Sequence, residues 1–153
     1  MKNMNYLFML FLSACVSNKI DTTHIELSIY PASGGEIGYN IIIKNDTIKT
    51  EVRELAIENN NIVLGKLKNE LQKTFTKTQK DSIKHYYELL NGNKKSIDNS
   101  FVLDTWIYVL KVNNKEIAKF NSYSMANNED KLNKFIIYLL KLSPIKLNLR
   151  GFS

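Results

Sequence analysis

Alternating apolar and polar residues predict β-strands in the segment that follows residue 23. Residues 24–30 place isoleucine or leucine at every second position, which is typical of a strand with one buried face. Residues 37–44 form a second predicted strand, and the three isoleucines at 41–43 favour apolar cover on both of its faces. Residues 45–46 are Asn-Asp, which suits a two-residue hairpin turn, so we expect a third strand over residues 48–52.

The next segment, residues 54–75, has no single period and supports two interpretations. The run Ile-Val-Leu at 62–64 favours a brief strand after a turn at the three asparagines 59–61. Three leucines with helical spacing favour a helix instead: Leu64, Leu67 and Leu71. Both interpretations stay open on the sequence.

Two later segments have the period of amphipathic helices. The first begins at Thr76 or Thr78, because each is followed after three residues by a partner for a capping box, Gln79 or Asp81. Its apolar stripe is Ile83, Tyr86, Tyr87 and Leu90. The second begins at residues 127–130, whose acidic side chains suit the positive end of a helix dipole. Its expected buried face is Leu132, Phe135, Ile136, Leu139 and Leu140.

Residues 101–112 form the most hydrophobic predicted strand, and the asparagines at 113–114 turn it into a second strand at 116–120. After Pro144 ends the last helix, residues 145–149 alternate again and suggest a short terminal strand. This order of elements predicts an α+β fold. We expect one mostly antiparallel sheet built from two hairpins, with two helices packed on one face.

The N-terminal residues carry the pattern of an export signal. Lys2 precedes a short apolar run at residues 6–12, far below the ~20 apolar residues that cross a bilayer. The run leads into Leu-Ser-Ala-Cys ending at Cys15, which resembles the lipobox of bacterial lipoproteins. The resemblance implies that residues 1–14 are a signal peptide and that acyl chains on Cys15 hold the protein in a membrane of the cell envelope.

Cys15 is the only cysteine in the 153 residues, which excludes an intramolecular disulfide and a multi-cysteine metal site. The alternative is a buried thiol in an N-terminal core helix. Under the lipoprotein interpretation, residues 15–23 form a lipidated tether and residues 24–153 a single globular α+β domain. We expect the outer membrane, with the domain facing the periplasm or the cell surface, and an inner-membrane location also agrees with the signal.

The formal net charge of +6 raises the question of a polyanionic partner. Only two of the 21 basic residues are arginine, Arg53 and Arg150, and the lysines are scattered. Nucleic-acid readers rely on arginine forks and clustered basic stripes, so we expect no nucleic-acid partner. The basic excess could instead favour anionic lipid headgroups near the anchor.

The sequence contains no recognisable catalytic or metal-binding constellation. His24 and His85 are far apart, and neither stands at a zinc-like spacing from a second ligand. The glycine-rich residues 33–38 lack the Gly-Lys-Ser/Thr ending of a phosphate loop. Glu51 and Glu54 are neighbours in sequence only. We therefore expect no catalytic residue, no metal, no cofactor and no enzymatic activity.

The predicted strand at residues 101–112 offers the best candidate for a partner-binding surface. By the two-residue period, Asp104, Trp106 and Tyr108 share one of its faces. If the intervening positions meet the two helices, these side chains stay exposed, and exposed aromatic patches mark interaction surfaces. In the alternative, residues 54–75 fold over this face and bury it, and Asp104 is a turn residue that bonds nearby amides.

Two short motifs resemble the emfourin-type inhibitors of secreted metalloproteases. These inhibitors carry a Gly-Gly-x-x-Gly turn and an Asp-x-x-x-Tyr strand in a similar order. Here Gly34, Gly35 and Gly38 form the first motif, and Asp104 and Tyr108 form the second. The resemblance implies an inhibitory activity; the lipid anchor and the lysine-rich stretch before the first helix depart from that pattern.

Together these features predict a lipid-anchored, non-enzymatic binding module of the cell envelope. The first interpretation is an inhibitor or immunity-type protein that captures a partner protein. The alternative is an accessory or assembly lipoprotein of an envelope complex. The two differ in gene neighbourhood, because an inhibitor is expected beside a secreted protease or toxin.

Overall fold

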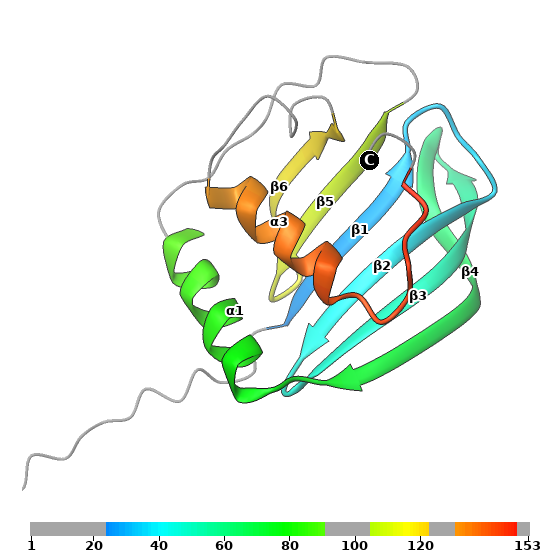
Figure 1. The fold of residues 1–153 in the computed structure, drawn as a ribbon. Helices are drawn as coiled ribbons and strands as arrows, with labels where there is room; N and C mark the ends of the chain where they lie inside the picture. The colour runs from blue at the N-terminus through cyan, green and yellow to red at the C-terminus, as the bar shows by residue number, and fades with distance from the viewer. Residues whose placement is uncertain (1–23, 91–104, 123–130, 150–153) are drawn as a thin grey trace, which may run out of the picture.

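The computed structural model describes residues 24–90, 105–122 and 131–149, which form a six-stranded sheet and two helices (Figure 1). The elements are β1 (Ile25–Pro31), β2 (Ile37–Lys44), β3 (Thr47–Glu58), β4 (Asn61–Thr74), α1 (Lys77–Leu90), β5 (Trp106–Val112), β6 (Lys115–Asn121) and α3 (Lys131–Leu142). All paired strands are antiparallel, in the order β4-β3-β2-β1-β5-β6. Both helices cover one face of the sheet (Figure 1), so the predicted α+β class is confirmed.

Asparagines close the tight hairpins of the sheet. Five of them have positive φ angles between 49° and 64°: Asn45, Asn59, Asn60, Asn113 and Asn114. Asparagine tolerates this left-handed region better than other residues with a side chain, and such turns match the twist of the flanking strands. The predicted turns at 45–46 and 113–114 are confirmed. The first of the two predicted hairpins extends into a four-stranded meander, β1 to β4.

The segment with two interpretations, residues 54–75, is almost entirely strand. β4 pairs with β3 from Thr47 opposite Thr74 to Glu58 opposite Asn61. The register shifts near Arg53, so the alternation of inward and outward side chains is interrupted there. That interruption explains why the leucines of β4 imitate helical spacing.

The capping box predicted at Thr76 fixes the start of α1. The backbone N–H of Thr76 donates to Gln79 Oε1 (2.9 Å), and the backbone N–H of Gln79 donates to Thr76 Oγ1 (3.3 Å). The helix begins at Lys77, so the alternative box at Thr78 is not used. The predicted stripe packs on α3, where the ring of Tyr86 lies 5.8 Å from that of Phe135.

The hydrophobic core lies between the sheet and the helices. Side chains at alternate positions of the four central strands fill it: Ile25, Leu27, Ile29, Tyr39, Ile41, Ile43, Ile48, Tyr108, Leu110 and Val112. The predicted face of the last helix completes the core, with Leu132, Phe135, Ile136 and Leu139 buried. We call this side of the sheet the helix face and the other side the open face.

The chain that follows α3 crosses the helix face without forming a strand. The Ser143 hydroxyl lies 2.9 Å from Thr50 Oγ1 on β3, and the backbone N–H of Asn148 donates to the Tyr39 hydroxyl on β2 (3.3 Å). The suggested terminal strand at 145–149 is therefore wrong. The alternating apolar residues pack down onto the sheet instead of adding to its edge.

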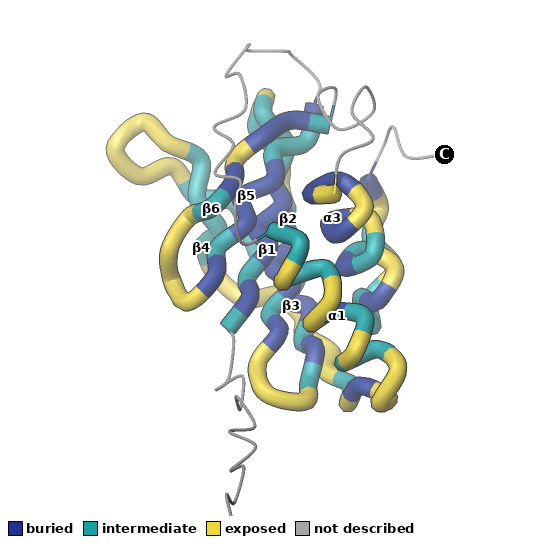
Figure 2. The backbone as a smooth tube through the Cα atoms, turned by 90° about the vertical axis from the view of Figure 1, so that its left-hand side faces the viewer, coloured by how far each residue is buried: buried dark blue, intermediate teal, exposed yellow. Residues whose placement is uncertain are grey.

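The hairpin of β3 and β4 curls over the open face. β4 is three strands away from β1 in the sheet order, yet it contacts β1 as well as β2. Gly38 on β2 allows this approach, because a Cβ at this position would lie 2.5 Å from Leu64 Cδ2 and 3.0 Å from Leu55 Cδ2. Most of β4 is nevertheless exposed on its outer side (Figure 2).

Candidate functional site

A groove of about 470 Å³ lies on the open face of the sheet, between the curled hairpin and the β5–β6 hairpin. We call it the sheet groove. Its lining residues are Glu26, Ser28, Tyr30, Asn40, Arg53, Ile62, Val63, Leu64, Val109, Lys111, Glu116 and Lys119. Its volume lies within the range of natural ligand sites, roughly 300–1,000 Å³.

The strand register brings mostly polar side chains into one row across the open face, and part of this row forms the floor of the groove. Ser28 on β1 is opposite Asn40 on β2, which is in turn opposite Glu51 on β3, and Val109 on β5 continues the row. All four residues are buried although they lie on the side of the sheet that has no helices. The curled hairpin therefore makes this face a partly enclosed polar layer.

Hydrogen bonds hold the floor of the groove in one arrangement. The Ser28 hydroxyl donates to Asn40 Oδ1 (3.2 Å), and Asn40 Nδ2 donates to Glu26 Oε1 (3.0 Å). A buried polar network of this kind rigidifies a surface when its members are satisfied. The carboxylate of Glu26 is thus oriented at the groove before any ligand arrives.

Glu51 connects the floor to the curled hairpin. Its side chain is only 3% exposed and binds Arg53 Nε at 2.6 Å and the ammonium of Lys49. Burial alone would raise the pKa of Glu51, but the hydrogen bonds and charges of Arg53 and Lys49 outweigh it and lower the pKa. Arg53 Nη1 also donates to the carbonyl oxygen of Gly65 on β4 (2.9 Å). This chain of contacts ties the hairpin to the sheet.

The two long walls of the groove differ in chemistry. Ile62, Val63 and Leu64 at the start of β4 make one wall apolar. The opposite wall, on β5 and β6, carries Lys111, Glu116 and Lys119. In the part of the chain that the structure describes, no ion pair joins either of these lysines to a carboxylate. Within these residues both ammonium groups therefore line the groove without a carboxylate partner.

Tyr30 adds a hydroxyl to the same groove. Burial raises the pKa of this phenol above its ordinary value, and the negative charge of Glu116 adds to the rise. The hydroxyl therefore stays protonated at neutral pH and can donate a hydrogen bond to a ligand.

The predicted exposure of the aromatic strand face is wrong. Trp106 and Tyr108 lie on the helix face, because Tyr108 pairs with the core residue Ile29 and stacks on Phe120 at 5.4 Å. Tyr108 is 0% exposed and offers no contact surface, and burial raises its pKa. The alternative, in which residues 54–75 bury the face of Trp106 and Tyr108, is also wrong in its geometry. Residues 54–75 fold over the open face, and the helices cover the face that carries the two aromatic residues. Asp104 lies outside the described residues.

Trp106 remains partly exposed and lies beside the glycine-rich turn. The backbone N–H of Ala32 donates to the carbonyl of Thr105 (2.8 Å), and Pro31 pairs with Trp106. Trp106 and Gly35 line a second hollow together with Tyr39. The two segments that carry the inhibitor-like motifs therefore lie side by side, although the turn and the strand are far apart in sequence.

The sequence pattern does not identify the residues of the sheet groove as a site. The positions of Glu26, Ser28 and Tyr30 alternate with the core residues of β1, which identifies them as one face of that strand. The alternation alone indicates a solvated face. Only the curled hairpin, with its irregular register, encloses these side chains in a groove.

The described residues contain no group of three or more side chains suited to hold a metal ion. None of their helices is long and apolar enough to span a membrane. Cys15 lies outside the described residues, so its lipidation stays a prediction. No family model, curated protein or solved structure matches the chain.

Proposed function

We propose that this chain is a lipid-anchored, non-enzymatic binding module of the bacterial cell envelope that captures a partner protein in the sheet groove. The observation that carries this proposal is the groove itself, with an apolar wall facing a wall of charged side chains over a hydrogen-bonded polar floor. A site of this kind favours recognition, since its polar groups are fixed before binding and little conformational freedom is lost on contact.

The two unlike walls favour an extended polypeptide as the ligand. Successive side chains of an extended segment point in opposite directions. A segment lying along the groove would direct one set toward Ile62 and Leu64 and the other toward Lys111 and Lys119. Acidic residues in the second set would bind the two ammonium groups. This arrangement supports an inhibitor or immunity-type protein that holds a segment of a secreted protease or toxin.

A second candidate function is supported by the edge of the sheet. β4 is 14 residues long, and its outer side exposes Leu67 (40%) and Leu71 (52%). An exposed strand edge can accept a strand from another protein. Under this alternative the chain is an accessory or assembly lipoprotein of an envelope complex, and β4 is its contact.

The proposal predicts that a secreted protease or toxin is encoded beside this chain, and binding to that protein tests the groove. The double variant K111E/K119E is expected to weaken binding. The dissociation constant measured by calorimetry should rise about tenfold or more, which corresponds to ~1.4 kcal/mol. The matched control K134E/K141E reverses two lysines that are exposed on α3 and should bind like the wild type. Equal losses in the two variants would contradict a groove-specific site, and a loss confined to Trp106→Ala would move the site to the glycine-rich turn.

The anchor is tested separately by labelling with a fatty-acid analogue. The Cys15 thiol is the only thiol that can accept a lipid. We expect the label on the wild-type chain, and its loss together with accumulation of an unprocessed precursor in Cys15→Ser. Persistent label in Cys15→Ser would refute the lipoprotein interpretation.

A further inference from the structure

The first described residue, His24, is fixed at one end of the sheet. Its backbone N–H donates to Asn113 Oδ1 (2.9 Å), and the backbone N–H of Asn113 donates back to the His24 carbonyl (2.7 Å). The adjacent residue Ile25 pairs with Ile43 on β2 and Val112 on β5. The β2–β3 turn and the β5–β6 turn therefore lie at this end, which we call the anchor end because residues 15–23 lead into it.

The start of α1 lies at the same end. The backbone N–H of Phe75 donates to the carbonyl of Asp46 in the β2–β3 turn (2.8 Å), and Lys80 Nζ pairs with the Asp46 carboxylate at 2.6 Å. The first two turns of α1 therefore stand beside the strand ends rather than over the centre of the sheet.

The anchor end has an excess of positive charge among the described residues. Six lysines lie on it: Lys44, Lys73, Lys77, Lys80, Lys84 and Lys115. The acidic residues beside them are fewer: Asp46, which pairs with Lys80, Glu88, which pairs with Lys84, and the neighbours Asp81 and Glu116. The opposite end carries Glu36 in the β1–β2 turn and Glu58 at the tip of the long hairpin. The charge is thus polarised along the sheet.

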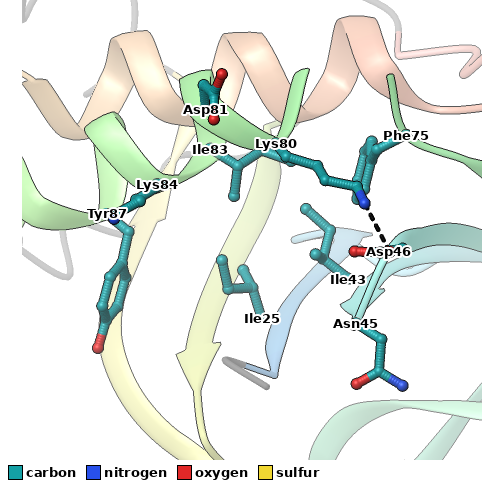
Figure 3. A pocket seen from close by; sticks show the side chains of 10 residues that line it. All are labelled: Ile25, Ile43, Asn45, Asp46, Phe75, Lys80, Asp81, Ile83, Lys84 and Tyr87. Carbon is teal, nitrogen blue, oxygen red and sulfur yellow. Dashed lines mark ion pairs between the residues drawn. The ribbon is translucent and has the colours of Figure 1, made fainter. Parts of the chain in front are cut away.

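An apolar hollow of about 470 Å³ opens at the anchor end between α1 and the sheet (Figure 3). Ile25, Ile43, Phe75 and Ile83 line its interior, and Lys80 bridges to Asp46 at its edge. Tyr87 borders the hollow with its ring and ends in a hydroxyl, an amphipathic side chain of the kind found at membrane interfaces.

We propose that the anchor end docks against the surface of a bilayer that contains anionic phospholipid, with the apolar hollow inside the contact. This inference rests on the proposed lipid anchor at Cys15. Residues 15–23 span at most roughly 30 Å when fully extended, so the lipid keeps this end near the headgroups. Basic side chains near such a surface are attracted within about one Debye length, roughly 8–10 Å. The docked orientation directs the opposite end, with the glycine-rich turn, away from the membrane.

The orientation can be measured on the mature lipidated protein in vesicles. Acylation blocks Cys15, so a single introduced cysteine can be labelled with a fluorophore. Thr74→Cys places the label at the anchor end, and Ser33→Cys places it in the turn at the opposite end. In phosphatidylcholine vesicles that contain phosphatidylglycerol, a paramagnetic headgroup lipid should quench the label at position 74 severalfold more than the label at position 33.

Three comparisons decide the inference. The difference in quenching should fall to the smaller value set by the tether alone in pure phosphatidylcholine, at high salt, and in the variant K77E/K115E, while the control K134E/K141E keeps the full difference. Equal quenching at both positions, or a difference that ignores phosphatidylglycerol, would overturn the docking but leave the lipid anchor standing. A chain that fails to float with the vesicles would overturn the anchor and the docking together.

Discussion

At the scale of single residues, a few charged side chains and a glycine allow the β3–β4 hairpin to lie on the open face. Glu51 is buried yet ionised, because Lys49 and Arg53 supply the hydrogen bonds and charge that water would otherwise supply. Arg53 extends this contact to β4 through the carbonyl of Gly65. Gly38 supplies the space that the hairpin needs. Each of these residues has a consequence for stability that can be measured.

Replacing Glu51 with Gln should destabilise the protein by about 1–3 kcal/mol at pH 7, since Arg53 and Lys49 would lose their charged partner. The folded-state pKa of Glu51 is below its unfolded value. The contribution of ionised Glu51 to the free energy of unfolding is therefore fully present above the ordinary carboxyl pKa, about 4.3. This contribution is lost as pH falls through the folded-state pKa. Urea unfolding of both proteins at a series of pH values measures the difference, which should shrink below about pH 4.

Glu54→Gln is the matched control for that series. Glu54 lies on the same strand, and its pairing with Lys68 at 3.6 Å is largely exposed, so its loss should cost less than about 1 kcal/mol. A Glu51→Gln effect as small as this, or one that stays constant into acid, would show that the buried carboxylate does not stabilise the fold.

Gly38→Ala should destabilise the protein by about 1–3 kcal/mol, because the added methyl group overlaps Leu64 and the carbonyl of Ile29. The double variant G38A/L64A removes the first of these overlaps. Its cost, measured from the urea midpoint, should therefore be smaller than the sum of the two single costs. Strict additivity would indicate that the hairpin does not rest on β2.

At the scale of elements, local signals place the ends of helices and strands, and pairing decides the rest. α1 begins where Thr76 and Gln79 exchange hydrogen bonds. The asparagine turns place the hairpin ends in the same local way. β4 has no comparable signal in its centre, and its strand conformation follows from pairing with β3 over most of its length.

Thr76→Ala should cost about 1 kcal/mol, since it removes the acceptor for the Gln79 N–H at the start of α1. Thr78→Ala should change the stability by less than about 0.5 kcal/mol, because Thr78 already lies inside the helix. Thermal unfolding followed by circular dichroism compares the two variants. The reverse order of effects would place the cap at Thr78.

At the scale of the whole molecule, the sheet is covered on both faces by different means. The helices and the chain after α3 cover one face with a hydrophobic core, and the curled hairpin partly covers the other with a polar layer. Hydrophobic burial supplies the main stabilisation on the first face. The second face can expose a groove because the fold does not depend on filling it.

Leu139→Ala should therefore cost about 2–5 kcal/mol, as expected for a leucine that is completely buried between α3 and the sheet. Ile137 is on the same helix and is 37% exposed, so Ile137→Ala should cost much less, about 0.5 kcal/mol. The melting temperatures of the two variants provide the comparison. An unchanged melting temperature for Leu139→Ala would contradict the packing of α3.

The local features of this protein are determined by its sequence alone. The two-residue period of β1 and β2, the asparagine turns, a capping box at Thr76 or Thr78 and the apolar stripe of α3 are all patterns of residues close together in the chain. Such patterns can be recognised without knowing which distant segments pair. The α+β class follows from them because it depends on the order of elements.

Which face of each strand meets the helices was decided only by tertiary structure. The period of β5 places Trp106 and Tyr108 on one side, but the choice of side depends on register with β1, where Tyr108 meets the core residue Ile29. The sheet groove depends on a register shift near Arg53 and on space at Gly38, which bring β4 over strands far from it in the sheet. Both are long-range outcomes. A one-residue change of register exchanges the two faces of a strand, and no turn sets the register between β1 and β5, which are far apart in the chain.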